Sequence, residues 1–176
     1  MALLASCSRS PAPTRAERIT AALLQIDDVP VGWLQTSDVM ISAKPACDGD
    51  AYWRTFRPEH EAGRFHRLQQ VIFDCSDSAG AAHTFWGMTR PMVRSVRPSE
   101  NFATQHPAHA DEFAAFCEFN VIGTTDCRLV VRYASVVSVI WSVHLTSMDE
   151  WPSEQDLLDW GTARNDLMLS KLARID

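Results

Sequence analysis

The alternation of apolar and polar positions is strongest between residues 113 and 145. The odd-numbered residues of 113–121 are apolar or cysteine, and the same phase continues through 127–133. A period of two is typical of strands that bury one face. Ile122-Gly-Thr-Thr-Asp126 lies between the two runs and is rich in turn formers, so the pattern predicts a β-hairpin. A run rich in β-branched residues predicts a third strand over 136–145, on which Val137, Val139 and Trp141 share the inner phase.

Helical spacing of apolar residues and local capping signals predict the remaining elements. The expected elements are a helix over 17–28, loops over 36–62, a strand over 65–75, a helix from Asp77 or Ser78 to about Arg90, a polar loop over 95–111, and a last helix starting at Pro152-Ser153.

The order of these elements predicts an α+β fold in a single domain. Three sequential strands imply an antiparallel sheet, and helices at the two ends of the chain imply the α+β class. We expect the helices to pack on the apolar inner face of the sheet and the other face to stay in contact with water. Trp86, Trp141 and Trp160 are expected to belong to the core.

Composition and charge restrict the class of function. The chain has 176 residues, of which 46% are hydrophobic and 22% are charged, and its formal net charge is −6. A weakly acidic surface argues against nucleic-acid binding and against a polybasic membrane patch. No apolar run approaches the roughly 18 residues that a membrane span requires.

The opening stretch Leu4-Ala5-Ser6-Cys7 resembles the lipobox of bacterial lipoproteins. In that motif the cysteine becomes the new N-terminus and carries lipid, so Cys7 is the expected lipidation site. Residues 8–15 are rich in Pro, Ser and Arg and predict a flexible tether. We therefore divide the chain into a truncated signal and tether over 1–16 and a folded domain over 17–176. A chance apolar N-terminus with an ordinary thiol is the alternative.

Cysteine number and spacing indicate disulfides. If Cys7 carries lipid, four cysteines remain, and in an exported protein four cysteines suggest two bridges with three possible pairings. The intervals between Cys47, Cys75, Cys117 and Cys127 fit no zinc module. Four ordinary buried thiols in a cytosolic protein remain the alternative.

Strand phase narrows the pairing. Cys117 and Cys127 fall on the inner face of the predicted hairpin, so a cross-strand bridge between them is feasible. That bridge leaves Cys47 and Cys75 to form the second one.

Several short phrases, in their order along the chain, resemble a group of bacterial extracytoplasmic domains. Those domains occur on lipoproteins and as the sensor domains of PknH-type receptor kinases. The phrases are Leu24-Gln-Ile-Asp-Asp-Val-Pro-Val-Gly-Trp33, Gln69-Gln-Val-Ile-Phe73, Ser78-Ala-Gly-Ala-Ala82, Ala110-Asp-Glu-Phe-Ala114 and Leu129-Val-Val-Arg-Tyr-Ala-Ser-Val-Val137.

This resemblance implies an α+β fold with a curved sheet and two disulfides paired in sequence order. It also implies sensing of a ligand or partner, and it supplies no catalytic residue.

Motifs for catalysis, nucleotides or metal are not found in the sequence. The glycines form no phosphate loop, and no G-x-S-x-G or H-E-x-x-H occurs. His106 and His109, with Asp111 and Glu112 nearby, are the best metal candidate, but Pro107 lies between the two histidines and no helix fixes their geometry. We expect neither a metal nor a cofactor. Arg54, Arg57 and Arg64 are expected in a solvated loop.

The outward phase of the three late strands is the predicted binding surface. Its polar residues include Glu118, Arg128, Arg132, Ser142 and His144, which we expect to share one shallow groove. Two arginines that project the same way can bind a carboxylate or phosphate. As exposed charges, both are expected to contribute little to folding stability.

These observations predict a lipid-anchored binding or sensor module without catalytic activity. Its location would be the outer face of the bacterial cytoplasmic membrane, with membrane contact through the lipid anchor only. The partner would be a small ligand or an envelope protein, and not a nucleic acid. The alternatives are an accessory subunit of a membrane complex and an enzyme of unrecognised type.

Overall fold

The computed structural model describes residues 11–37, 40–42, 47–59, 67–90, 95–98, 107–120, 123–145 and 154–172. Its elements, in chain order, are α1 (Arg15–Ala22), the 3-10 turn η1 (Ile26–Asp28), β1 (Trp33–Gln35), β2 (Met40–Ser42), β3 (Gly49–Pro58), β4 (Arg67–Cys75), α2 (Ser78–Thr89), β5 (Ser95–Pro98), β6 (Glu112–Asn120), β7 (Thr124–Tyr133), β8 (Val136–Leu145) and α3 (Glu154–Leu172).

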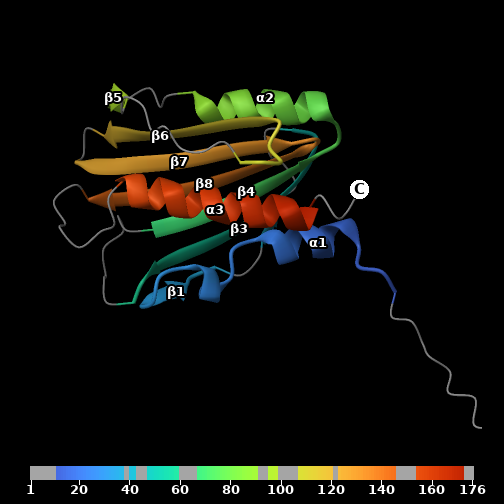
Figure 1. Ribbon diagram of the computed structural model, residues 1–176, viewed down its shortest axis with the longest axis horizontal. Helices are drawn as coiled ribbons and strands as arrows, with labels where there is room; N and C mark the ends of the chain where they lie inside the picture. The colour runs from blue at the N-terminus through green and yellow to red at the C-terminus, as the bar shows by residue number, and fades with distance from the viewer. Residues whose placement is uncertain are drawn as a thin grey trace, which may run out of the picture.

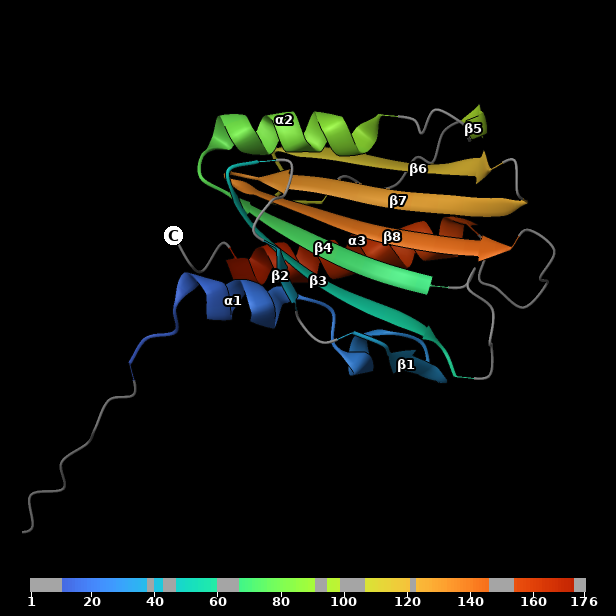
Figure 2. The same ribbon diagram turned by 180° about the vertical axis from the view of Figure 1, so that it is seen from behind.

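The strands form one antiparallel sheet. Their order across the sheet is β1-β3-β4-β8-β7-β6-β5, and β2 pairs with β3. α3 crosses one face of the sheet with α1 beside it (Figure 1), and the view from behind shows the strands in front of both helices (Figure 2). The predicted α+β fold with an antiparallel sheet is confirmed.

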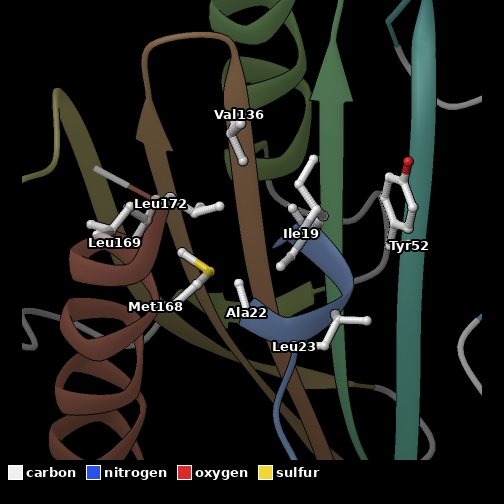
Figure 3. Packing of buried hydrophobic residues seen from close by; sticks show 10 residues of the cluster. Ile19, Ala22, Leu23, Tyr52, Val136, Met168, Leu169 and Leu172 are labelled. Carbon is white, nitrogen blue, oxygen red and sulfur yellow. The ribbon is translucent and has the colours of Figure 1, made fainter. Parts of the chain in front are cut away.

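The core beneath α1 and α3 is aliphatic and is shown in Figure 3. Ile19 and Leu23 of the N-terminal segment and Met168 and Leu169 of α3 are almost fully buried against the sheet. Tyr52 of β3 closes one side of this cluster. Burial of such side chains stabilises the fold by about 1.5–3 kcal/mol each.

A second helix layer lies on the opposite face. Asp77 caps the N-terminus of α2 by accepting a hydrogen bond from the backbone N–H of Gly80 at 2.7 Å. Ala81 and Phe85 of α2 then pack in one cluster with Val130 and Val139 of the sheet. The expectation that one face of the sheet stays wet is therefore wrong, because both faces of the sheet pack against helices.

The turn between β7 and β8 explains why the predicted phase of β8 is also wrong. Only Ala134 and Ser135 separate the strands, so Tyr133 pairs with Val136 and each odd-numbered residue of β7 pairs with an even-numbered residue of β8. The side chains of Val137, Val139 and Trp141 consequently face α2. They do not share the face of Leu129 and Val131, as the sequence pattern suggested.

Two side chains of the sheet end the first helix earlier than predicted. The side-chain oxygen of Gln70 accepts a hydrogen bond from the backbone N–H of Leu24 at 2.6 Å, and the Arg54 guanidinium donates to the Leu24 carbonyl at 2.7 Å. These contacts replace helical hydrogen bonds, so the chain leaves the helix after Ala22. Arg54 is thus buried on β3, and the expectation of a solvated loop at this position is wrong.

Strand β3 is the largest element that the sequence analysis missed. Tyr52, Arg54 and Phe56 point toward α1 and α3, whereas Ala51 and Trp53 pack on the α2 side. The strand lacks a clear apolar–polar alternation because Arg54 lies on its buried face and the apolar Ala51 and Trp53 lie on its other face.

Both expected disulfides are present. Cys47–Cys75 links the segment before β3 to the end of β4, with 5.5 Å between the Cα atoms. Cys117–Cys127 joins residues that pair directly across β6 and β7. The bridges close segments of 28 and 10 residues.

Removing either bridge should lower the free energy of unfolding by about 2–4 kcal/mol, because the cross-link restricts the unfolded chain. The loss should be greater for Cys47→Ala/Cys75→Ala, which opens the longer loop, than for Cys117→Ala/Cys127→Ala. Urea unfolding of both variants measures this difference. Wild-type stability in either variant would contradict the prediction.

Candidate functional site

A group of charged and aromatic side chains gathers on the α2 face of the sheet. We call it the Arg–Trp cluster, and it comprises Arg67 of β4, Phe116 and Glu118 of β6, Asp126 and Arg128 of β7, and Trp141 of β8.

Strand register brings these residues together. Phe116, Arg128 and Trp141 form one row across three neighbouring strands. Glu118 and Asp126 pair in the next row, at the side of the sheet where Arg67 begins β4. Direct neighbours on one face have Cβ atoms about 4.5–5.5 Å apart, so both rows place their side chains within contact distance.

Arg128 lies at the centre of the Arg–Trp cluster. Its guanidinium carbon is 5.1 Å from the centre of the Trp141 ring and 5.7 Å from that of Phe116. Glu118 supplies the opposing charge, with 3.6 Å between the nitrogen and oxygen atoms. Arg128 is only 7% exposed, and its Nε and Nη2 atoms have no hydrogen-bond partner within the described ranges.

Trp141 connects the buried half of the cluster to its exposed half. The indole N–H donates a hydrogen bond to the carboxylate of Asp126. The guanidinium carbon of Arg67 lies 4.9 Å from the ring centre, and Arg67 is exposed while Trp141 is half-buried. One indole therefore attracts two cations, each through its π face.

Only part of the predicted groove forms. Glu118 and Arg128 contact each other, and Arg132 lies on the same face. Arg132, however, is engaged by Glu112 and by Asp111, the latter at 3.3 Å. Ser142 is buried on the opposite face, because it pairs with Cys127 in the layer beneath α3. The side chain of His144 lies outside the described residues.

Sequence reasoning missed Arg67, Asp126 and Trp141 as members of the cluster. The signal that could have placed Trp141 was the length of the turn before β8. A two-residue loop is the most common hairpin connection, and counting its pairs places Trp141 opposite Arg128.

Perturbed pKa values occur away from the Arg–Trp cluster. Burial raises the pKa of the Tyr52 hydroxyl, and the charges of Asp50 and Asp74 raise it further. Hydrogen bonds from the backbone and side chain of Thr14 lower the pKa of Glu17, the acid of the α1 capping box. The Tyr52 shift follows from burial and neighbouring charges and the Glu17 shift from the helix cap, and we assign neither residue a catalytic role.

The predicted core role of Trp86 is wrong, since the side chain lies on the outer surface of α2 and is 59% exposed. His109 is exposed and His106 lies outside the described residues, and the described residues contain no group of three metal-ligating side chains. None of the described helices is both long and apolar enough to span a membrane.

These features define an α+β domain with two disulfides and a twisted antiparallel sheet between helices. Its fold is similar to that of a solved structure, the extracellular domain of PknH from Mycobacterium tuberculosis. The TM-score is 0.51 at 12% sequence identity, and the match covers 91% of this chain and 98% of that chain. No protein-family model matches the chain, and no curated protein sequence matches it significantly.

Burial of Arg128 overturns the expectation that this arginine contributes little to stability. Arg128→Ala should lower the free energy of unfolding by about 3–5 kcal/mol, because it breaks a buried ion pair with Glu118 and removes the guanidinium from between the Trp141 and Phe116 rings. Arg132→Ala is the matched control on the same strand. Its carboxylate partners contact water, so the loss should be about 1 kcal/mol or less. Equal stability losses in the two variants, measured by urea unfolding, would contradict this account.

Proposed function

We propose that the chain is a non-catalytic extracytoplasmic binding or sensor domain held to the membrane by lipid on Cys7. The observation that carries the proposal is the pair of disulfides in a fold similar to that of an extracellular domain. Disulfides persist in oxidising compartments and are rare in the cytosol, so they support a location outside the cytoplasmic membrane.

The anchor is supported by the lipobox-like stretch that ends in Cys7 and by the tether that follows it. The other four cysteines form bridges, which leaves Cys7 as the cysteine available for lipid. The first helix begins at Arg15, so the seven residues 8–14 connect the proposed anchor to the folded domain.

Expression of the gene in its host should give a membrane-bound chain that begins at a lipidated Cys7. Intact-mass spectrometry of the membrane fraction measures the added mass, and Cys7→Ser should release the chain from that fraction. A wild-type chain that begins at Met1 without added mass would contradict the anchor.

Ligand capture is supported best by the exposed half of the Arg–Trp cluster. Arg67 offers a planar, permanently charged donor group, and the half-buried Trp141 ring offers an apolar surface beside it. Arg128 is enclosed and Arg132 is engaged by carboxylates, so the proposed contact shifts from these two arginines to Arg67. The matching ligand chemistry is an anionic group next to an apolar or planar one.

Benzoate, which combines a carboxylate with a planar ring, is a suitable probe of this surface. Titration should shift the indole N–H resonance of Trp141 in a saturable way, and Arg67→Ala should weaken the apparent affinity at least fivefold. Arg90→Ala is the control, because Arg90 is also exposed but lies at the end of α2. Unchanged affinity in Arg67→Ala would contradict the assignment.

A second candidate function is an accessory subunit of a membrane complex. The observation that favours it is the exposed surface of α2. Trp86 lies there, and its neighbours His83 and Gly87 are exposed as well. Exposed tryptophans are enriched among residues that dominate protein–protein binding. Loss of a co-purifying membrane protein in Trp86→Ala, with none in Arg67→Ala, would favour this function over ligand sensing.

A further inference from the structure

Exposed aliphatic side chains concentrate at one edge of the sheet. Ile26, Val31 and Leu34 are 45%, 105% and 42% exposed, and they lie within nine residues of one another in the chain. We call these three residues the edge patch. Within the described residues, the other large hydrophobic side chains of similar exposure are Trp86 and Leu167, each on a different helix.

The edge patch surrounds β1, the outermost strand on its side of the sheet. η1, which carries Ile26, lies against β1 (Figures 1 and 2). Trp33 packs into the core on the α1 side of the sheet, so Leu34, the next residue of the strand, points to the α2 side. Ile26 lies in η1 against β1, Leu34 lies on β1 itself, and Val31 lies in the turn between them.

The turn holds Val31 in the solvent. Gly32 has a φ of +89°, a conformation that favours glycine, and no atom lies within 4 Å of the position its Cβ would take. The carbonyl of Gly32 accepts a hydrogen bond from the backbone N–H of Glu59 at 2.7 Å, which ties the turn to the end of β3. The turn therefore holds the Val31 side chain in water, where it gains no stabilisation from burial of apolar surface.

Charges around the edge patch do not favour an anionic partner. Asp27 and Glu59 are exposed beside it, and Arg57 is exposed opposite Leu34 on β3. Among the described residues, the charges beside the edge patch are therefore of both signs. Contact through the edge patch would therefore rest on apolar insertion and would be insensitive to salt.

The length of the tether and the place where it joins the domain indicate that the edge patch lies near the lipid bilayer. The eight peptide steps from Cys7 to Arg15 span at most about 29 Å, so an anchored domain stays close to the bilayer. The guanidinium of Arg15 binds the Asp74 carboxylate at 2.8 Å and the Ser135 hydroxyl at 3.0 Å, which fixes the end of the tether on the domain. From there α1 leads toward β1 along the same side of the domain (Figure 1).

We propose that the edge patch inserts into the surface of the lipid bilayer to which Cys7 ties the domain. This inference rests on the proposed lipid anchor and adds a second membrane contact to it. Three aliphatic side chains alone bind a bilayer weakly, but a covalent anchor raises their effective concentration at the surface to the millimolar range. The domain then lies with its β1 edge against the membrane.

The test uses the full chain with both disulfides intact and Cys7 coupled to a maleimide lipid in phosphatidylcholine vesicles. Hydrogen exchange of residues 26–35, followed by mass spectrometry, is compared between the coupled chain and the chain in solution. Exchange should slow at least fivefold on the vesicles, equally at low and high salt. Val31→Asp/Leu34→Asp should abolish the protection.

Leu167→Asp is the matched control, because Leu167 is the same residue type with nearly the same exposure but lies on α3. This variant should keep the protection of residues 26–35. Equal exchange of these residues on vesicles and in solution would overturn the proposal, and so would equal loss of protection in the control. In this experiment the anchor is supplied by chemical coupling, so the result does not depend on lipidation in the host. Absence of lipid on Cys7 in the host would contradict the proposed anchor but would leave the hydrogen-exchange result unchanged.

Discussion

The two-residue connection between β7 and β8 is the constraint on which the two faces of the sheet depend. Ala134 takes a left-handed conformation with a φ of +48°, and the strands pair from Tyr133 and Val136 outward. A shift of one residue would exchange every side chain of β8 between the two faces. Trp141 would then leave Arg128 for the layer beneath α3, and the Arg–Trp cluster would not form.

The same register aligns a line of buried polar groups beneath α3. Ser138 accepts a hydrogen bond from Gln70 and donates one to Asn165, both at 3.2 Å, while Gln70 also holds the backbone of Leu24. The segment that follows α1 is therefore joined to β4, β8 and α3 through side chains that are 1% exposed or less. Buried polar groups are costly when they lack partners, so this network favours one arrangement of helices on the sheet.

The sequence predicted those features that depend on neighbouring residues. The β6–β7 hairpin, its cross-strand disulfide and the capped start of α2 follow from local alternation and turn chemistry, and all are confirmed. β3 was missed because a charged residue, Arg54, lies on its buried face and Trp53 lies on the other, and the first helix was predicted too long because side chains distant in sequence bind Leu24.

The candidate site was predicted less well, for a related reason. Glu118 and Arg128 were assigned correctly to one surface because both lie within the β6–β7 hairpin. Ser142 was assigned to that surface by continuing the alternation across the turn, which the register reverses. Arg67 enters from β4, which pairs with β8 across a large separation in sequence, and no local pattern indicates that neighbour.

The account depends most on which face of the sheet carries Trp141, and nuclear Overhauser effects from its indole protons measure this directly. On the register described, these protons should show contacts to the side chains of Arg128 and Arg67 and none to Trp160 of α3, which packs with Leu129 and Ile140 on the other face. Contacts from the Trp141 ring to the α3 side chains, without contacts to Arg128, would contradict the register and the site that it builds.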